Sequence, residues 1–236
     1  MNLVILFADD FIDNHRVQLQ GRRLHHIQNV HRAVIGDVIA VGLVDGQIGK
    51  GTIIQLNHAA VTLNIELSQA PPPPLPLTLI LALPRPKMLK RILQTATTMG
   101  VKKIILLNSY RVEKSYWQTP WLSSEKINDC LLLGLEQAKD TLMPEVILEK
   151  RFKPFVEDRL PALCANTTAL VAHPHTDKPC PIGIKQQTTL VIGPEGGFID
   201  YEIDKLQQAG CQPVHIGPRI LTVDMAVPAI LSRLFP

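Results

Sequence analysis

The segment Thr188-Thr-Leu-Val-Ile-Gly-Pro-Glu-Gly-Gly-Phe198 decides how the second half of this chain is organised. It opens with a strand-forming run, Thr188–Ile192, and a helical pattern follows the glycines at Asp200–Gln208. Pro194 stiffens the intervening loop, and Gly196-Gly197 permits positive φ angles. We predict a pre-shaped loop whose backbone amides and carbonyls contact a small molecule. A plain tight turn before a helix is the alternative.

A second loop of the same kind follows at His215-Ile-Gly-Pro-Arg-Ile-Leu221, where a strand pattern again ends in Gly-Pro before a helical pattern. Neither loop has the Gly-Lys-Ser/Thr ending of a P-loop or the G-x-G-x-x-G spacing, so ordinary nucleotide-phosphate binding is not indicated. Ligands of parallel sheets bind beyond the carboxyl ends of the strands. We therefore expect the loops after Ala172, Ile192 and Ile216 to frame one pocket.

Strand and helix patterns alternate from residue 77 onward, which predicts an α/β fold with a mainly parallel sheet covered on both faces. The expected strands are Leu77–Leu83, Lys103–Leu107, Glu145–Leu148, Thr167–Ala172, Thr188–Ile192 and Pro213–Ile216. The expected helices are Lys87–Met99, Ser123–Lys139, Asp200–Gln208 and Asp224–Leu234, and Gly100 and Gly210 stand where glycines end helices.

The first 70 residues have β-like patterns instead. Strands are expected at Asp37–Val44, Gly51–Leu56 and Ala60–Leu67, with a hairpin turn at Asp45-Gly46 and one helix around Leu24–Arg32. The run Ala70-Pro-Pro-Pro-Pro-Leu-Pro76 suits a semi-rigid spacer. We therefore predict a small β-barrel domain over 1–70, a proline-rich linker over 71–76 and a larger domain over 77–236, the alternative being an irregular loop inside one domain.

Composition narrows the class of protein. The chain has 236 residues, 46% of them hydrophobic, and a net charge of only +3, so a nucleic-acid-binding surface has to be a local patch. The four cysteines form no C-x-x-C pair, and no metal site is expected. With no basic leader and no apolar run near 20 residues, we expect a cytoplasmic protein that does not enter a membrane.

The two Gly-Pro loops, Ile192–Phe198 and Gly217–Leu221, together resemble the ribosomal RNA small-subunit methyltransferase E family of the SPOUT class. Further landmarks of that family match along nearly the whole chain: Val30-His-Arg32, Gly36-Asp37, Gly100-Val101, Glu136-Gln137 and Pro144.

The resemblance implies a PUA-like RNA-binding barrel, a SPOUT α/β domain with a C-terminal trefoil knot, a homodimer, and methylation of N3 of a uridine in 16S ribosomal RNA within the small ribosomal subunit. It also implies S-adenosylmethionine as cofactor. The residues matched to its binding are Ala172, His173, Ile192, Gly193, Pro194, Glu195, Gly196, Gly197, Ile216, Gly217, Ile220, Leu221, Thr222 and Ala226.

Several polar positions depart from the family pattern: Thr95, Thr98, Asp140, Thr222 and Asp224. These departures leave open an alternative, an RNA-binding homologue with an altered target or without catalysis. For methyl transfer to N3, we expect Asp224 to act as general base and Arg219 to stabilise the developing uridine anion, with Glu195 as a weaker candidate.

Two basic clusters are candidate RNA contacts, because lysine and arginine neutralise phosphates. One is Arg22, Arg23 and Arg32, and the other is Arg85, Lys87 and Arg91; an ordinary solvated surface is the alternative for each. His173-Pro-His175 is expected to form a wall of the pocket rather than a metal site. The final helix is apolar on more than one face, which favours a dimer interface there or a central helix of the monomer.

Overall fold

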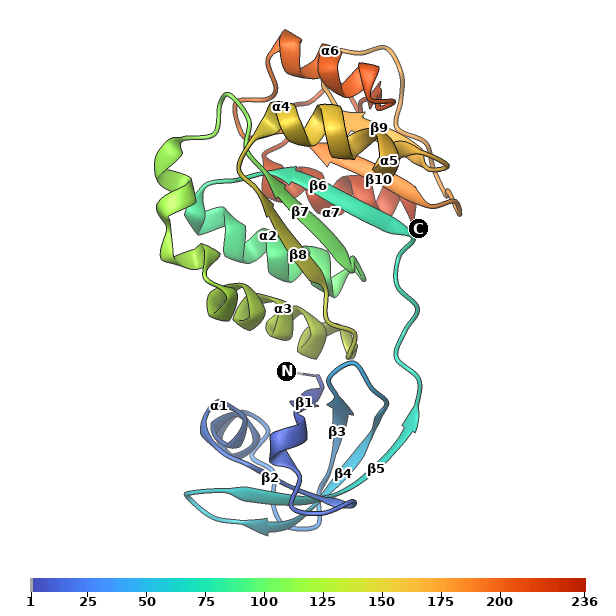
Figure 1. Cartoon of the computed structure of the whole chain (residues 1–236). Coiled ribbons are helices and arrows are strands. Elements are labelled where there is room, and N and C mark those ends of the chain that lie inside the picture. The colour runs from blue at the N-terminus through green and yellow to red at the C-terminus, as the bar shows by residue number, and fades with distance from the viewer. Residues whose placement is uncertain (1) are drawn as a thin grey trace. The chain divides into compact units, whose positions relative to one another are not determined.

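The computed structural model describes residues 2–236, which form two compact units. The first contains the chain up to Pro73 together with Leu132–Met143, and the second contains Pro74–Leu131 and Pro144–Pro236 (Figure 1). The division falls inside the proline run. The return of 132–143 to the first unit was not predicted, because nothing in the helical pattern of Ser123–Lys139 marks a change of partner along that helix.

The first unit is built on a five-stranded sheet with the order β1-β3-β4-β5-β2. Its strands are β1 (Val4–Leu6), β2 (Arg16–Leu19), β3 (Val38–Leu43), β4 (Ile48–Leu56) and β5 (Val61–Gln69). β3 and β4 form the hairpin predicted around Asp45-Gly46, where Asp45 has a φ of 55°. β1 and β2 are the two edges, and no ladder joins them in residues 2–236. The sheet is therefore curved and open, and hydrogen bonds among the described residues do not close it into the predicted barrel.

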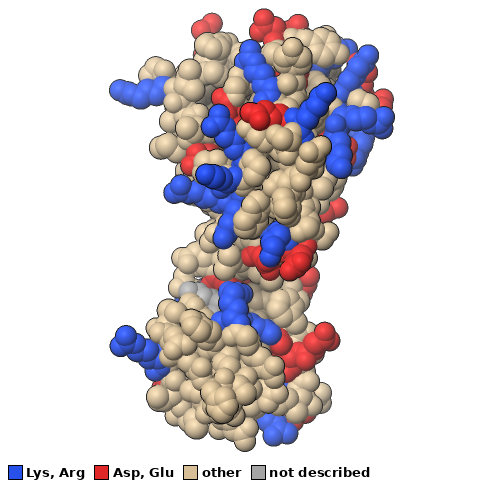
Figure 2. Space-filling view, turned by 90° about the vertical axis from the view of Figure 1, so that its left-hand side faces the viewer, with Lys and Arg blue, Asp and Glu red and all other residues tan. Residues whose placement is uncertain are grey.

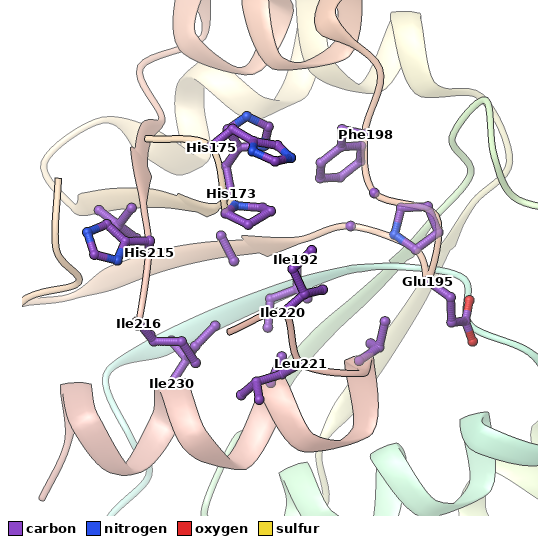
Figure 3. Close-up of a pocket in the computed structure, with 18 of the residues that line it drawn as sticks. His173, His175, Ile192, Glu195, Phe198, His215, Ile216, Ile220, Leu221 and Ile230 are labelled. Carbon is purple, nitrogen blue, oxygen red and sulfur yellow. The ribbon is translucent and has the colours of Figure 1, made fainter. Parts of the chain in front are cut away.

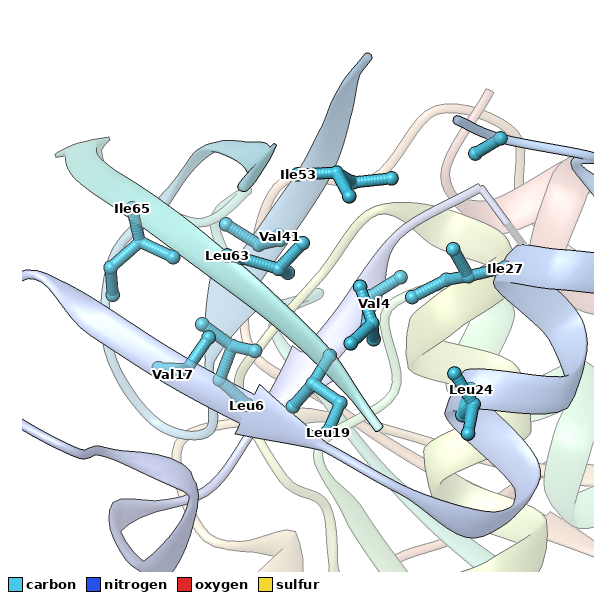
Figure 4. Packing of buried hydrophobic residues seen from close by; sticks show 12 residues of the cluster. Val4, Leu6, Val17, Leu19, Leu24, Ile27, Val41, Ile53, Leu63 and Ile65 are labelled. Carbon is cyan, nitrogen blue, oxygen red and sulfur yellow. The ribbon is translucent and has the colours of Figure 1, made fainter. Parts of the chain in front are cut away.

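A hydrophobic cluster lies on one side of this sheet (Figure 4). Val41, Ile53 and Leu63 from the central strands pack with Leu24 and Ile27 from the adjoining helical segment. Burying each such side chain stabilises the fold by about 1.5–3 kcal/mol. The helix predicted around Leu24–Arg32 is present as two consecutive turns, α1 (Gly21–His25) and a π-helical turn (His26–Val30).

The second unit contains a six-stranded, wholly parallel sheet with the order β11-β9-β10-β6-β7-β8. The strands are β6 (Leu77–Ala82), β7 (Lys103–Leu107), β8 (Glu145–Glu149), β9 (Thr168–Ala172), β10 (Thr188–Ile192) and β11 (Gln212–Val214). The predicted parallel α/β fold is confirmed. Every residue of the central strands β6 and β10 is buried, as expected for a sheet covered on both faces.

Helices cover the two faces of this sheet (Figure 1). They are α2 (Pro86–Thr98), α3 (Ser124–Ala138), α4 (Phe152–Pro154), α5 (Leu160–Cys164), α6 (Asp200–Gln208) and α7 (Val223–Leu234). α2 packs against α7 on one face, and α4, α5 and α6 lie on the other. None of the helices in residues 2–236 is long and apolar enough to cross a membrane.

One helical stretch, Phe152–Cys164, was not predicted. It consists of α4, a π-helical turn (Phe155–Arg159) and α5. Pro154 and Pro161 interrupt its sequence, and prolines ordinarily argue against a continuous helix. Here each proline falls where the helical geometry changes, so short turns succeed one another.

Candidate functional site

Three strands of the second unit end side by side, and this fixes where the loops predicted to bind a ligand emerge. Ile192, the last residue of β10, is in register with Ala172, the last residue of β9. Ala172 is in turn in register with Val214, the last residue of β11. Because all three strands are parallel, the segments that begin at 173, 193 and 215 leave the same edge of the sheet.

These segments surround a cavity of about 260 Å³ (Figure 3). Its lining contains Arg111, Ala172, His173, Pro174, His175, Ile192, Gly193, Pro194, Glu195, Gly196, Gly197, Phe198, Val214, His215, Ile216, Gly217, Arg219, Ile220, Leu221, Val223, Ala226 and Ile230. Gly193 and Gly217 both belong to it, so the prediction that the two Gly-Pro loops meet at one pocket is confirmed. Every residue matched to cofactor binding lies in the lining except Thr222.

The first loop owes its shape to different properties of its two adjacent glycines. Gly197 has a φ of +72°, a conformation that residues with a Cβ rarely adopt. Gly196 does not have a positive φ; a Cβ there would lie 3.0 Å from Cδ of Arg111. Gly196 thus leaves space for the Arg111 side chain, whose Nη1 donates a hydrogen bond to the Gly196 carbonyl.

The second loop is stabilised by its own histidine. The backbone N–H of Gly217 donates to Nδ1 of His215 at 3.2 Å, and Gly217 has a φ of +146°. Beyond this turn, apolar side chains from the loop and from α7 lie together in the close-up view: Ile216, Leu221 and Ile230 (Figure 3). The cavity therefore has an apolar floor and a rim of backbone polar groups, which is the usual construction of a small-molecule site.

Glu195 links the first loop to α2. Its Oε1 accepts a hydrogen bond from the backbone N–H of Arg85 at 3.0 Å, and Arg85 immediately precedes α2. In Figure 3 the Glu195 carboxylate points away from the apolar residues of the cavity. A carboxylate at the N-terminus of a helix also interacts favourably with the helix dipole. Glu195 is therefore placed to hold the loop in position.

Two histidines form the wall predicted from His173-Pro-His175. Their rings lie 5.6 Å apart in an edge-to-face arrangement (Figure 3). Burial lowers the pKa of His173 below its ordinary value, and the neighbouring His175 lowers it further. A neutral imidazole therefore faces the cavity at neutral pH. No group of three or more metal-ligating side chains occurs in the part of the chain that the structure describes.

The two residues predicted to be catalytic occupy different positions. Arg219 is exposed and lines the cavity. Asp224 lies in the first turn of α7, and Thr222 immediately precedes that helix. Neither residue belongs to the lining of the cavity. The Thr222 hydroxyl donates to Oδ1 of Asp224 at 2.6 Å, and Oδ2 lies 3.8 Å from Nη1 of Arg91. Both side chains are thus engaged at the start of the helix, and cofactor contact by Thr222 and a general-base role for Asp224 stay predictions.

The predicted basic clusters also differ from each other. Arg22 forms two hydrogen bonds to the buried carboxylate of Glu136, at 2.8 and 2.7 Å. Arg23 binds Asp10, with Nη2 2.6 Å from Oδ1. Arg32 is exposed at a φ of 52°. In this cluster, two of the three arginines therefore stabilise the fold of the first unit.

The second cluster is more open. Arg85, Lys87 and Arg91 are all exposed, at the start of α2 and on its first turns. Nη1 of Arg91 lies 3.8 Å from Oδ2 of Asp224, and the Arg91 side chain is 72% exposed. Figure 2 shows many Lys and Arg side chains on the face of the second unit that carries α2.

Sequence reasoning did not identify several residues of the lining, among them Arg111, Phe198 and Ile230. Phe198 closes the Gly-rich loop, since a Cβ on Gly193 would lie 3.1 Å from its ring. Ile230 lies two helical turns into α7 and carries no motif. Arg111 follows β7, and the position of β7 two strands from β10 is a property of the sheet order, which only the structure provides.

Comparison with known proteins gives a consistent result. A family model described as "RNA methyltransferase domain" matches residues 71–235. Ribosomal RNA small subunit methyltransferase E of Treponema pallidum is 24% identical over 96% of this chain and 87% of its own length. The protein of the same name from Synechocystis is 27% identical over 98% of this chain and 76% of its own length.

Two solved structures have the same fold. Ribosomal RNA small subunit methyltransferase E of Neisseria gonorrhoeae, solved with bound S-adenosyl methionine, aligns with a TM-score of 0.73 at 18% identity, covering 98% of this chain and 95% of that one. A Legionella pneumophila structure, described as a methyltransferase in complex with the cofactor SAM, aligns with a TM-score of 0.76 at 21% identity over 98% and 95% of the two chains.

Proposed function

The chain belongs to the RNA methyltransferase family, and we propose that it transfers the methyl group of S-adenosylmethionine to ribosomal RNA of the small subunit. One observation carries the proposal: three strands ending in register bring both Gly-Pro loops around one cavity. The similar proteins are named as methyltransferases of small-subunit ribosomal RNA, and a cavity of this kind suits the cofactor of such an enzyme.

The cavity fits S-adenosylmethionine by the chemistry of its walls. The adenine ring needs an apolar slot with backbone groups at its edge, which Ile192, Ile216, Leu221 and Ala226 and the two loops provide. The neutral ring of His173 adds no positive charge to a cavity that would hold a cationic cofactor. When bound, the cofactor supplies an electrophilic methyl group. The proposed contacts are Ala172, His173, Ile192, Gly193, Pro194, Gly196, Gly197, Ile216, Gly217, Ile220, Leu221 and Ala226.

We place the finer reaction at N3 of a uridine, as the resemblance implies. N3 carries a proton at neutral pH, and loss of this proton to solvent leaves negative charge on the base. Arg219 is exposed at the cavity and suits stabilisation of that charge. Asp224, bonded to Thr222 and near Arg91, has a positioning role at the start of α7 in this proposal, rather than that of the general base.

The RNA-binding surface is proposed to centre on Arg85, Lys87 and Arg91, because these side chains are exposed beside the cavity-forming loop. Arg32 is proposed as a separate RNA contact on the first unit. Arg22 and Arg23 contribute less, since each is already paired with a carboxylate.

Three further features of the SPOUT class are proposed for this chain. The first is a PUA-like role for the first unit. The second is a trefoil knot formed by the segment after β11, which must travel from the edge of the sheet to reach α7 beside α2. The third is a homodimer that uses α7. Support for the dimer comes from large apolar side chains left exposed on and near this helix: Met225 at 57%, Ile220 at 77% and Ile182 at 68%.

The experiment that tests the proposal combines calorimetry with S-adenosylmethionine and a radiolabelled methyl-transfer assay. Small subunits carrying unmodified ribosomal RNA are the substrate, and large subunits are the control. We expect cofactor binding and label in small-subunit RNA only, with the product mapped to a uridine. Cofactor binding without transfer to any RNA would favour the alternative of a binding protein without catalysis.

A further inference from the structure

Two consecutive residues on the loop after β7 have exposed side chains. Tyr110 is 78% exposed, far more than an aromatic ring of a folded domain ordinarily is. Arg111 is also exposed, and it lines the cavity. In residues 2–236 Arg111 makes no ion pair, and its Nη1 donates to the Gly196 carbonyl. A guanidinium group at the cavity and the aromatic ring of the preceding residue are therefore both exposed to a ligand.

The backbone that carries these side chains is firmly held. The N–H of Tyr110 donates to Oε1 of Glu202 at 2.7 Å, and the N–H of Val112 donates to the carbonyl of Ser109 at 3.1 Å. Glu202 is only 2% exposed, and its Oε2 accepts from the N–H of Ile199 at 3.1 Å. One buried carboxylate thus joins the Tyr110 segment to the end of the Gly-rich loop.

Arg111 adds a second link between the same two segments. Its side chain lies along the backbone of Gly196, with Nη1 on the carbonyl and Cδ close to the glycine. The guanidinium is therefore fixed in place, which reduces the side-chain entropy lost when it binds a ligand. A cation held on the Gly-rich loop and an exposed ring on a held backbone are an arrangement suited to binding rather than to packing.

Single-stranded RNA is bound by this combination of groups. Bases stack on aromatic rings, and arginines contact the phosphates between them. The surroundings favour the same ligand, because Arg85, Lys87 and Lys114 are exposed on the second unit as well. The segment from 108 to 122 and α2 both lie on the left side of Figure 1, the side that Figure 2 turns to the viewer with its many Lys and Arg side chains.

We propose that Tyr110 and Arg111 form an RNA platform at the mouth of the cavity, where Tyr110 stacks on a base next to the methylated nucleotide and Arg111 binds the adjoining phosphate. This inference rests on the proposed function, since it takes the substrate to be RNA. Through Gly196, the platform also joins RNA binding to the loop that holds the cofactor.

The test measures affinity by fluorescence anisotropy, independently of methyl transfer, with two labelled probes of equal length: an oligouridylate and an abasic ribose-phosphate strand. We expect Tyr110→Ala to weaken oligouridylate binding by at least about fivefold, and Tyr110→Phe to bind like wild type, because stacking needs the ring and not the hydroxyl. On the abasic strand Tyr110→Ala should equal wild type. Arg111→Ala should weaken binding of both probes and reduce the salt slope by about 0.7.

Matched controls are Tyr201→Ala and Arg151→Ala, two exposed residues of the second unit outside the cavity lining. Both should bind the probes like wild type. The platform is overturned if Tyr110→Ala binds oligouridylate as wild type does, if it loses as much affinity on the abasic strand, or if wild type binds neither probe. Wild type that binds oligouridylate in this pattern but methylates no RNA would refute the proposed function and leave the platform standing.

Discussion

The carboxylate of Glu195 accepts a hydrogen bond from the backbone N–H of Arg85 at 3.0 Å, joining the Gly-rich loop after β10 to the start of α2. Replacing Glu195 with alanine frees the loop at this point. A hydrogen bond to a charged acceptor contributes about 1.5–3 kcal/mol at most and less when exposed, so cofactor affinity should fall roughly threefold to tenfold. Calorimetry measures this. Glu145→Ala, at an exposed residue that begins β8, is the control and should leave affinity unchanged.

Gly197→Ala should damage the loop more than Gly196→Ala. At a φ of +72° an alanine costs about 1–2 kcal/mol, and both the free energy of unfolding and cofactor affinity should decrease. Alanine at 196 meets only the flexible side chain of Arg111. Chemical denaturation of the two variants compares them directly. Equal stability for both would show that the loop has another backbone conformation in solution.

Cofactor binding should weaken in mild acid because of His173. Its pKa is lowered from 6.5 by burial, so the folded protein takes up this proton at lower pH than the unfolded chain does. Between those two values the unfolded state binds more protons, and stability is lost as pH falls through that window. Once protonated, the ring would also repel the sulfonium cation. Calorimetry from pH 7.5 down to about pH 5 should show that cofactor affinity decreases as the pH falls. In the His173→Gln variant this pH dependence should largely disappear.

Asp224 and Arg91 should act as a coupled pair. Asp224→Asn and Arg91→Ala each disturb the start of α7, and the double variant should lose less activity than the product of the two single losses. The coupling should be at most about 1 kcal/mol, because the Arg91 side chain is exposed.

Methyl-transfer rates measured across a range of pH decide the role of Asp224. If Asp224 is a general base, the rate of the Asp224→Asn variant should rise steeply with pH. If Asp224 is a positioning residue, the shape of the pH profile should be unchanged.

The dimer is tested at Met225, which is 57% exposed on α7 and lies outside the cavity. Sedimentation should give about twice the chain mass of 26.2 kDa, and Met225→Glu should shift the species toward 26.2 kDa. Ile12→Glu, a residue of the first unit that is 52% exposed, is the control. Ile230 is unsuitable for this purpose, since it is 2% exposed and a charge there would unfold the second unit. A wild-type species at 26.2 kDa would exclude the dimer.

The sequence was most informative where one element decides its own structure. Lys103–Leu107 and Thr188–Ile192 were predicted with the bounds the structure has, because short apolar runs with flanking turn residues have few alternatives. Gly100 and Gly210 end helices with φ angles of +89° and +106°, as their positions indicated.

The sequence was least informative where contacts between segments far apart in the chain determine what a residue does. The partner of Arg22 is Glu136, 114 residues away, so its basic neighbourhood looked like an open RNA patch. Asp224 was likewise interpreted as a general base because the sequence does not show that Arg91 lies 3.8 Å from its carboxylate. Tyr110 and Arg111 carry no recognisable motif, and Arg111 reaches the cavity only because β7 lies beside β6, next to β10.

The most direct measurement of the central claim is methyl transfer by wild-type protein compared with the Gly197→Ala variant, using radiolabelled S-adenosylmethionine and small subunits with unmodified RNA. We expect label in small-subunit ribosomal RNA with wild type and a strong loss with the variant, in step with its weaker cofactor binding. Wild-type protein that binds no S-adenosylmethionine, or that binds it and labels no RNA, would contradict the proposed methyl transfer.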